Sequence, residues 1–180
     1  MVTRLFWECM TNNGFSQGIN ILRKLNKTIF IPPIIIEQTK KIKFKNGNVL
    51  YDLIKQDLHI GNCGLISILM SLLFDDCSIL FGKNEYLKGT VNSPNGEHAW
   101  LLVGDSIYDM TLFIQLKHEE EMILGYMENF EIRKKELLNC VAYQKWNNSY
   151  KRDEPLDENL EQEIMDYVLN IYLENRISRI

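Results

Sequence analysis

The sequence predicts an α+β domain in which a buried helix packs on an antiparallel sheet, with further helices toward the C-terminus. Residues 41–45 alternate lysine with apolar side chains and lead into Asn46-Gly47, a strong hairpin turn. Residues 64–74 carry no charge, which is typical of a helix buried on nearly every side. Residues 98–103 and 107–111 are two mostly apolar stretches separated by three polar or small residues, which predicts a second hairpin. Strands joined by hairpins and mixed with helices indicate the α+β class.

The remaining elements of the N-terminal half follow from spacing and composition. Residues 15–26 place apolar side chains at helical intervals, which predicts a helix. Residues 28–36 are apolar but contain Pro32 and Pro33, which favours an extended segment or edge strand. Residues 49–53 are expected to form the returning arm of the first hairpin.

The C-terminal part is expected to be helical. Residues 116–138 are rich in Glu, Lys, Met and Leu, which favour helices. Residues 157–176 follow Pro155, which suits a position near a first helical turn. That segment repeats apolar residues as an amphipathic stripe, for core packing or for contact with a partner helix: Leu160, Ile164, Val168 and Ile171.

Length and charge limit the class of protein. The 180 residues are expected to form one domain, with a core at about 50–115 and a helical part at about 116–180. With 20 basic and 24 acidic residues, a nucleic-acid binder is excluded on electrostatic grounds. The apolar runs are shorter than the ~20 residues that span a bilayer, and the N-terminus lacks a signal-peptide pattern. We therefore expect no membrane association, and a protein that acts in the cytoplasm or is secreted without a cleaved signal peptide.

One of the four cysteines stands apart from the others. No CxxC pair is present, which argues against a zinc ribbon or a disulfide scaffold, and Cys9, Cys77 and Cys140 are expected to be packing thiols. Cys63 lies in residues 61–64 (GNCG), directly before the buried helix. A helix N-terminus presents unpaired N–H groups and a positive dipole end, and both favour the reactive thiolate. The backbone N–H of Cys63 is also placed to serve as an oxyanion donor.

A nucleophilic thiol needs a base, and the base needs a group that orients it. His98 begins the first strand of the second hairpin, and Asp109 lies in the second strand, where a buried carboxylate requires a partner. If the loop has an even number of residues, His98 lies opposite Thr111, and Asp109 shares its face one diagonal step away. A three-residue loop would turn Asp109 to the other face unless a bulge corrected the register. An even loop or a bulge is therefore predicted, with Trp100 and Ile107 on the catalytic face.

These motifs resemble a known family over about residues 50–115. The motifs GNCG before a helix, HAW at 98–100 and YDMT at 108–111 resemble the transglutaminase-like branch of the papain-like thiol enzymes. The resemblance implies that Cys63 is the nucleophile, His98 the general base and acid, and Asp109 the orienting group. It also implies a papain/transglutaminase-like fold, with the nucleophile helix packed on the sheet.

The spacing is similar to that of compact bacterial members of the family, with 35 residues from Cys63 to His98 and 11 from His98 to Asp109. These members include leader peptidases of lasso-peptide biosynthesis and effectors that deamidate host glutamines. The chain departs from many relatives at Gly64, where they carry a large side chain. Gln56 and Asn62 are the candidates for a second oxyanion donor. The substrate-binding candidates are Trp100 and Gly64, and specificity is expected to reside partly in the loop at 81–96.

The resulting hypothesis is a cysteine-dependent amide-bond enzyme that forms an acyl-enzyme, with a protein or peptide as its substrate. Hydrolysis of a glutamine side chain or of a peptide bond is expected, with no metal and no cofactor. The alternatives are acyl transfer to an amine, as in a transglutaminase, and a non-catalytic interaction domain that retains the enzyme fold. His59 is the alternative to His98 as the base. A metal site with Cys63, His98 and Asp109 as ligands is the alternative to a catalytic triad.

Overall fold

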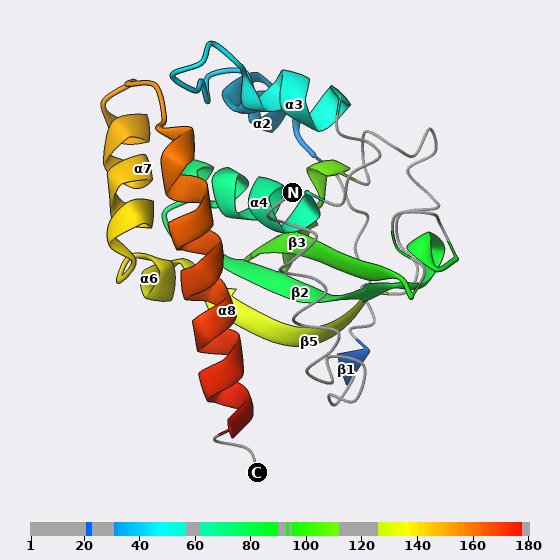
Figure 1. Cartoon of the computed structure of the whole chain (residues 1–180). Coiled ribbons are helices and arrows are strands. Elements are labelled where there is room, and N and C mark those ends of the chain that lie inside the picture. The colour runs from blue at the N-terminus through cyan, green and yellow to red at the C-terminus, as the bar shows by residue number, and fades with distance from the viewer. Residues whose placement is uncertain are drawn as a thin grey trace.

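A five-stranded antiparallel sheet forms one layer of the molecule (Figure 1). The computed structural model describes residues 21–22, 31–56, 62–89, 93, 95–111 and 126–177. The strand order is β1-β5-β2-β3-β4. In chain order the strands are β1 (Ile21–Leu22), β2 (Ser78–Asn84), β3 (Glu97–Val103), β4 (Ser106–Tyr108) and β5 (Tyr126–Arg133). The predicted α+β class with an antiparallel sheet is confirmed.

Helices pack on one face of this sheet. In Figure 1, α4 lies between the sheet and the pair α2 and α3, while α7 and α8 lie side by side at the end of the sheet. The bounds of the helices are α2 (Pro33–Thr39), α3 (Leu50–Gln56), α4 (Cys63–Met70), α6 (Lys134–Leu137), α7 (Val141–Lys151) and α8 (Glu161–Ile177). Three short 3-10 helices connect these elements: η2 (Ser71–Leu73), η3 (Glu85–Leu87) and η5 (Glu158–Leu160). Among the described helices, none is long and apolar enough to cross a membrane.

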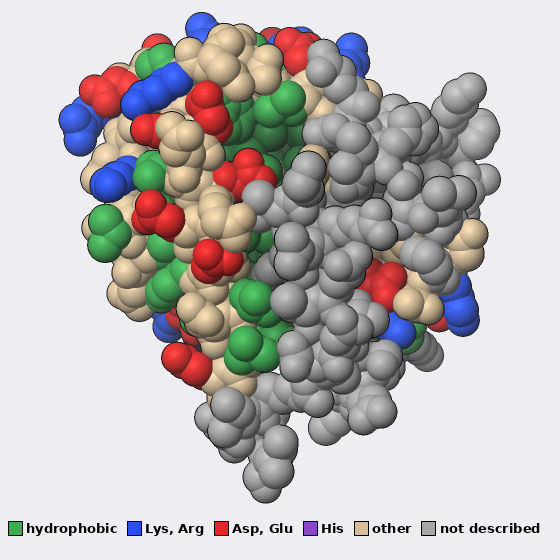
Figure 2. All heavy atoms as spheres, in the orientation of Figure 1, with side chains coloured by type: hydrophobic (Ala, Val, Ile, Leu, Met, Phe, Trp, Pro, Cys, Tyr) green, Lys and Arg blue, Asp and Glu red, His purple; other side chains and the backbone are tan. Residues whose placement is uncertain are grey.

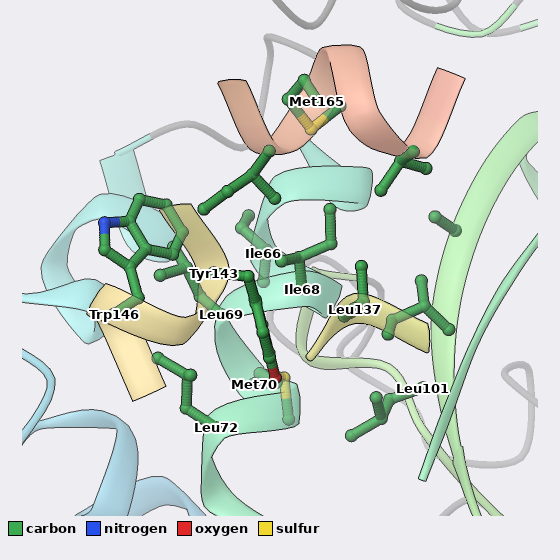
Figure 3. Close-up of a cluster of buried hydrophobic side chains, with 14 of the residues drawn as sticks. Ile66, Ile68, Leu69, Met70, Leu72, Leu101, Leu137, Tyr143, Trp146 and Met165 are labelled. Carbon is green, nitrogen blue, oxygen red and sulfur yellow. The ribbon is translucent and has the colours of Figure 1, made fainter. Parts of the chain in front are cut away.

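The predicted buried helix is confirmed as α4 with its continuation η2. All its residues except Leu65 and Leu73 are buried, because it is covered by the sheet on one side and by other helices elsewhere. Figure 3 shows its apolar side chains among those of Tyr143 and Trp146 from α7, Met165 from α8 and Leu101 from β3. A helix enclosed in this way has a fixed position relative to the strands, which in turn fixes the position of its N-terminus.

The amphipathic helix predicted at 157–176 is also confirmed. Helix α8 covers the expected segment, and Ile164 and Val168 are fully buried while Leu160 is nearly so. The stripe therefore packs into the core, with Ile171 half-buried at its border. Helix α7, which precedes it, lies within the part expected to be helical, although its bounds were not predicted.

The extended segment predicted for 28–36 is wrong where the structure describes it. Helix α2 begins there, with Pro32 as its N-cap and Pro33 in the first turn. Proline is tolerated at this position because its fixed φ suits the helix and its missing N–H would have no partner inside the helix. The helix buries Ile35 and Thr39, which lie one turn apart on the same face.

The first hairpin is confirmed only at its turn. Gly47 has a φ of +89°, and Lys43 and Val49 form an antiparallel bridge around it. The returning arm is wrong, because α3 begins at Leu50, which is buried together with Ile54 four residues later on one helical face. Of the helix predicted at 15–26 the structure describes only Ile21–Leu22, and these two residues form a strand paired with β5 instead.

The helix predicted at 116–138 is wrong at residues 126–133, which form β5, and is confirmed only at α6; residues 112–125 lie outside the described part of the chain. The strand is followed directly by α6. Phe130 and Ile132 are buried while Glu131 and Arg133 are exposed, so a period-two pattern exists at its end. Helix-favouring residues mask this pattern, and pairing with β2 overrides their preference.

Strand β2 was not predicted from the sequence, and its second half lies in the segment 81–96 that was expected to be a specificity loop. The strand lies in the middle of the sheet, between β5 and β3. Its residues from Ile79 to Phe81 are fully buried, as expected for a central strand. The segment available to act as a loop is therefore shorter than predicted.

A bulge in β5 changes which face of the sheet its side chains occupy on either side of the bulge. The register with β2 shifts between Phe81 and Gly82, so that Phe81 pairs with Phe130 and Gly82 pairs with Glu128. One residue of β5 is thereby unmatched. Tyr126 and Phe130 are four residues apart and would share a face in a regular strand. They belong instead to separate buried clusters, Phe130 under the helices and Tyr126 on the opposite face of the sheet.

Candidate active site

Cys63 is the first residue of α4, as predicted, and its side chain is 6% exposed. Asn62 is the N-cap residue and its side chain makes no capping hydrogen bond to the helix. The first-turn N–H groups and the positive end of the helix dipole therefore lie next to the sulfur. This environment favours a negative charge at the sulfur or at an oxygen bonded beside it.

His98 and Asp109 are brought together by the second hairpin. Val103 pairs with Ser106 and Leu101 with Tyr108, the register expected for an even loop. Strand β4 ends at Tyr108, and residues 110–111 are helical. The prediction that this strand continues to residue 111 is therefore wrong: Asp109 lies just after the strand, and Thr111 lies outside it and not opposite His98. His98 Nε2 and Asp109 Oδ2 are 2.5 Å apart, and the two residues are 3% and 1% exposed.

The Asp109 carboxylate is hydrogen-bonded on both oxygens. Oδ2 accepts from the Tyr126 hydroxyl at 2.9 Å in addition to His98, and Oδ1 accepts from the Thr111 hydroxyl at 3.1 Å. Donors of this kind stabilise the ionised carboxylate in a buried position. The charge on Asp109 is thereby held next to the imidazole.

The imidazole also interacts with the thiol. Burial lowers the pKa of His98, but the charge of Asp109, the charge of Cys63 and hydrogen bonds from both side chains raise it to about 10. Because Nε2 is bonded to Asp109, Nδ1 is the ring nitrogen left to face the sulfur. The described residues thus place thiol, imidazole and carboxylate in one chain of contacts.

An aromatic cluster packs beside this chain of contacts. Trp100 stacks on His98 with ring centroids 6.1 Å apart, and Tyr126 contacts Trp100 edge-on at 4.8 Å. Trp100 and Ile107 share one buried cluster, while Ala99 and Leu101 belong to the other, so the predicted division of faces is confirmed. Trp100 was expected to contact substrate, but it is 1% exposed and supports the imidazole from within the sheet.

The other predicted site residues are Asn62, Gln56 and Gly64. Asn62 is half-buried beside Cys63, and Gln56 is the last residue of α3, with a side chain outside the described part. Gly64 is buried, and a side chain there would meet the Phe81 ring at 3.3 Å. A large residue does not fit at this position, which faces the core and not the imidazole.

The remaining cysteines and histidines divide in the same way. Cys77 and Cys140 are buried free thiols in the core, which confirms their packing role, and burial raises the pKa of Cys77 to about 12. Cys9, His59 and His118 lie outside the described residues. Within the described part, no group of three or more His, Cys, Asp or Glu side chains is arranged to hold a metal ion.

Sequence reasoning missed Tyr126, because it falls in a segment that was predicted to be helical. A strand prediction alone would not have found it either, since the bulge decides which face it occupies. Thr111 carried a weak signal, as a hydroxyl two residues after the carboxylate in the YDMT motif.

The surface over α7 and α8 is mixed in character. Figure 2 shows acidic and basic side chains interspersed there with apolar ones. Comparisons with protein-family models, with curated proteins and with solved structures give no match. The case for a function therefore depends on the arrangement of the site itself.

Proposed function

We propose that this chain is a cysteine-dependent amide hydrolase with a papain/transglutaminase-like arrangement, in which Cys63, His98 and Asp109 form the catalytic triad. The observation that carries the proposal is the contact chain from a thiol at a helix N-terminus, through His98, to a multiply hydrogen-bonded Asp109. Burying a thiol, an imidazole and a carboxylate together is costly for the fold. Clusters of such groups with shifted pKa values are therefore more common at functional sites than elsewhere in a core.

The reaction begins from a protonated His98 beside the thiolate. The sulfur attacks the amide carbonyl, and the N–H groups at the start of α4, including that of Cys63, stabilise the oxyanion. His98 then gives its proton to the departing amine, and the C–N bond breaks to leave a thioester at Cys63. Water, deprotonated by His98, attacks the thioester and releases the carboxylic acid, which regenerates the thiolate–imidazolium pair.

The substrate class that this site supports best is a protein glutamine side chain, with a peptide bond next. Cys63 is nearly buried, and a thin, unbranched carboxamide reaches such a sulfur more readily than a folded backbone does. Resemblance to deamidating effectors favours the same class. Hydrolysis converts the glutamine to glutamate with release of ammonia, whereas an amine that replaces water gives a transglutaminase product.

The first prediction concerns the reactivity of the thiol. Iodoacetamide at about pH 6 is expected to label Cys63 faster than Cys140, because protonated His98 contacts the Cys63 sulfur and the thiolate is the reactive form. Peptide mass analysis locates the label, and Cys63→Ala is expected to lose it, together with any conversion of glutamine to glutamate in substrate proteins measured by intact mass.

Cys140→Ala is the matched control, since it removes another buried free thiol. It is expected to keep both the labelling and the activity. A wild-type protein in which Cys63 reacts no faster than Cys140 at that pH would favour the non-catalytic interaction domain.

A further inference from the structure

Tyr126 stands outside the proposed triad, yet its hydroxyl bonds the same carboxylate oxygen that orients His98. The hydroxyl donates to Asp109 Oδ2 at 2.9 Å, and Tyr126 is 2% exposed. It comes from β5, which is separated from β3 by β2. A buried donor that reaches across the sheet to this oxygen requires a dedicated geometry.

Two features of the sheet provide that geometry. The bulge opposite Phe81 and Gly82 turns Tyr126 to the face of Trp100, while Phe130 stays under the helices. Gly82 of β2 pairs with His98 of β3. Because glycine has no side chain, nothing at this position of β2 obstructs the sheet face that carries Trp100 and Tyr126. A Cβ at Gly82 would lie 1.9 Å from the Met127 carbonyl oxygen, so β5 can approach β2 this closely only at a glycine.

We propose that Tyr126 is a positioning residue for the reaction of Cys63: it locks the Asp109 carboxylate in the orientation that holds His98 with Nε2 inward and Nδ1 toward the sulfur. With Thr111 on Oδ1 and Tyr126 on Oδ2, the carboxylate is held at both oxygens and does not rotate away from the ring. The assignment rests on the proposed function for its catalytic meaning, but its structural consequence is measurable without a substrate.

The consequence is a change in the proton affinity of His98. Among the described residues, the charged or titratable groups that face His98 are Cys63 from α4, Asp109 after β4 and, through Asp109, Tyr126 from β5. The neighbour on β2 is Gly82, which has no charge. Burial, followed by the charge of Asp109 and the hydrogen bond to it, raises the pKa of Tyr126 well above its ordinary value, so that it remains a donor throughout the titration of His98.

The test follows the imidazole by NMR in protein labelled with ¹³C at histidine Cε1, with the His98 signal assigned from the His98→Gln variant. In the wild type we expect His98 to keep its proton up to about pH 10. In Tyr126→Phe the carboxylate loses one anchor and the Nε2 bond loosens, so the midpoint is expected to fall toward neutral pH by about one unit or more.

Tyr143→Phe is the matched control. Tyr143 is also a buried tyrosine with a hydrogen-bonded hydroxyl, but its partner is Ser71 in the helical layer. It is expected to leave the His98 midpoint unchanged. If Tyr126→Phe does not fold, Thr111→Val removes the donor on the other oxygen and is expected to lower the midpoint by a smaller amount.

The outcomes separate the two proposals. A midpoint that stays in place or rises in Tyr126→Phe overturns the positioning role, since a hydroxyl that merely competes for the charge of Asp109 would give a rise. Iodoacetamide labelling of Cys63 in the same samples tests the proposed function. A wild-type protein in which iodoacetamide does not label Cys63 would contradict the proposed function, while the effect of Tyr126→Phe on the His98 titration would still stand.

Discussion

His98 has a proton affinity that depends on its two neighbours. In the folded protein its pKa is about 10, compared with an ordinary value of 6.5, because the effects of Asp109 and Cys63 exceed that of burial. A raised pKa means that the folded protein holds the proton where the unfolded chain has already released it. Folding and protonation of this one residue are therefore linked.

This linkage predicts a pH dependence of stability. Below pH 6.5 both states bind the proton and the stabilisation is complete; as the pH rises toward about 10 it is lost. The difference in unfolding free energy between wild type and His98→Gln is thus expected to be largest at low pH and to shrink as the pH rises. Urea denaturation of both proteins across this range measures it, and other titrations cancel in the comparison. A difference that grows with pH would contradict the ion pair.

At the scale of elements, the site depends on where β5 can approach β2. Gly82 permits this approach because the backbone of β5 occupies the space of its absent Cβ, with the Met127 oxygen at 1.9 Å and the Glu128 Cα at 2.9 Å. Backbone atoms in a paired strand cannot move aside as the end of a side chain can. The glycine is therefore a requirement of the bulge and, through it, of the position of Tyr126.

A pair of glycine substitutions tests this requirement. Gly82→Ala is expected to lower the unfolding free energy by about 2–4 kcal/mol, since the strands must separate. Gly64→Ala makes the same chemical change in α4, where the new Cβ meets two side chains, the edge of the Phe81 ring at 3.3 Å and the end of Met165 at 3.9 Å, and alanine favours the helix. Its effect is expected to be about 1 kcal/mol or less. Equal effects in chemical denaturation would show that the close approach at β2 is not what matters.

Helix α4 shows the same dependence in another form. Its first residue carries the thiol, while its other side chains are enclosed by α7, α8 and the sheet. The enclosure keeps the helix end and the strand end together, so that the thiol and His98 stay in contact. The position of the Cys63 thiol is a consequence of packing along the whole helix.

At the scale of the molecule, α8 closes the core around α4. Ile164 is fully buried, and Ile164→Ala is expected to lower the unfolding free energy by about 2–4 kcal/mol in one cooperative transition. The single transition follows because the helices and the sheet share one buried cluster. Asn170→Ala, at an exposed position of the same helix, is expected to have almost no effect. Two separate transitions in thermal unfolding would contradict the single-domain prediction.

The parts of this protein that the sequence determined are those set by local rules. The uncharged run predicted α4, the apolar stripe predicted α8, and a glycine turn predicted the even register that joins β3 and β4. Each depends on residues close together in the chain, where periodicity and turn geometry decide the outcome.

Only the tertiary structure decided the rest. Residues 126–133 favour a helix by composition, but β2, more than 40 residues earlier, pairs with them as a strand. The bulge that turns Tyr126 toward Asp109 exists because Gly82 lets two backbones approach. Contacts between distant segments override local preference when they bury more surface and satisfy more hydrogen bonds. The carboxylate that orients His98 was therefore visible in the sequence, whereas the hydroxyl that holds that carboxylate was not.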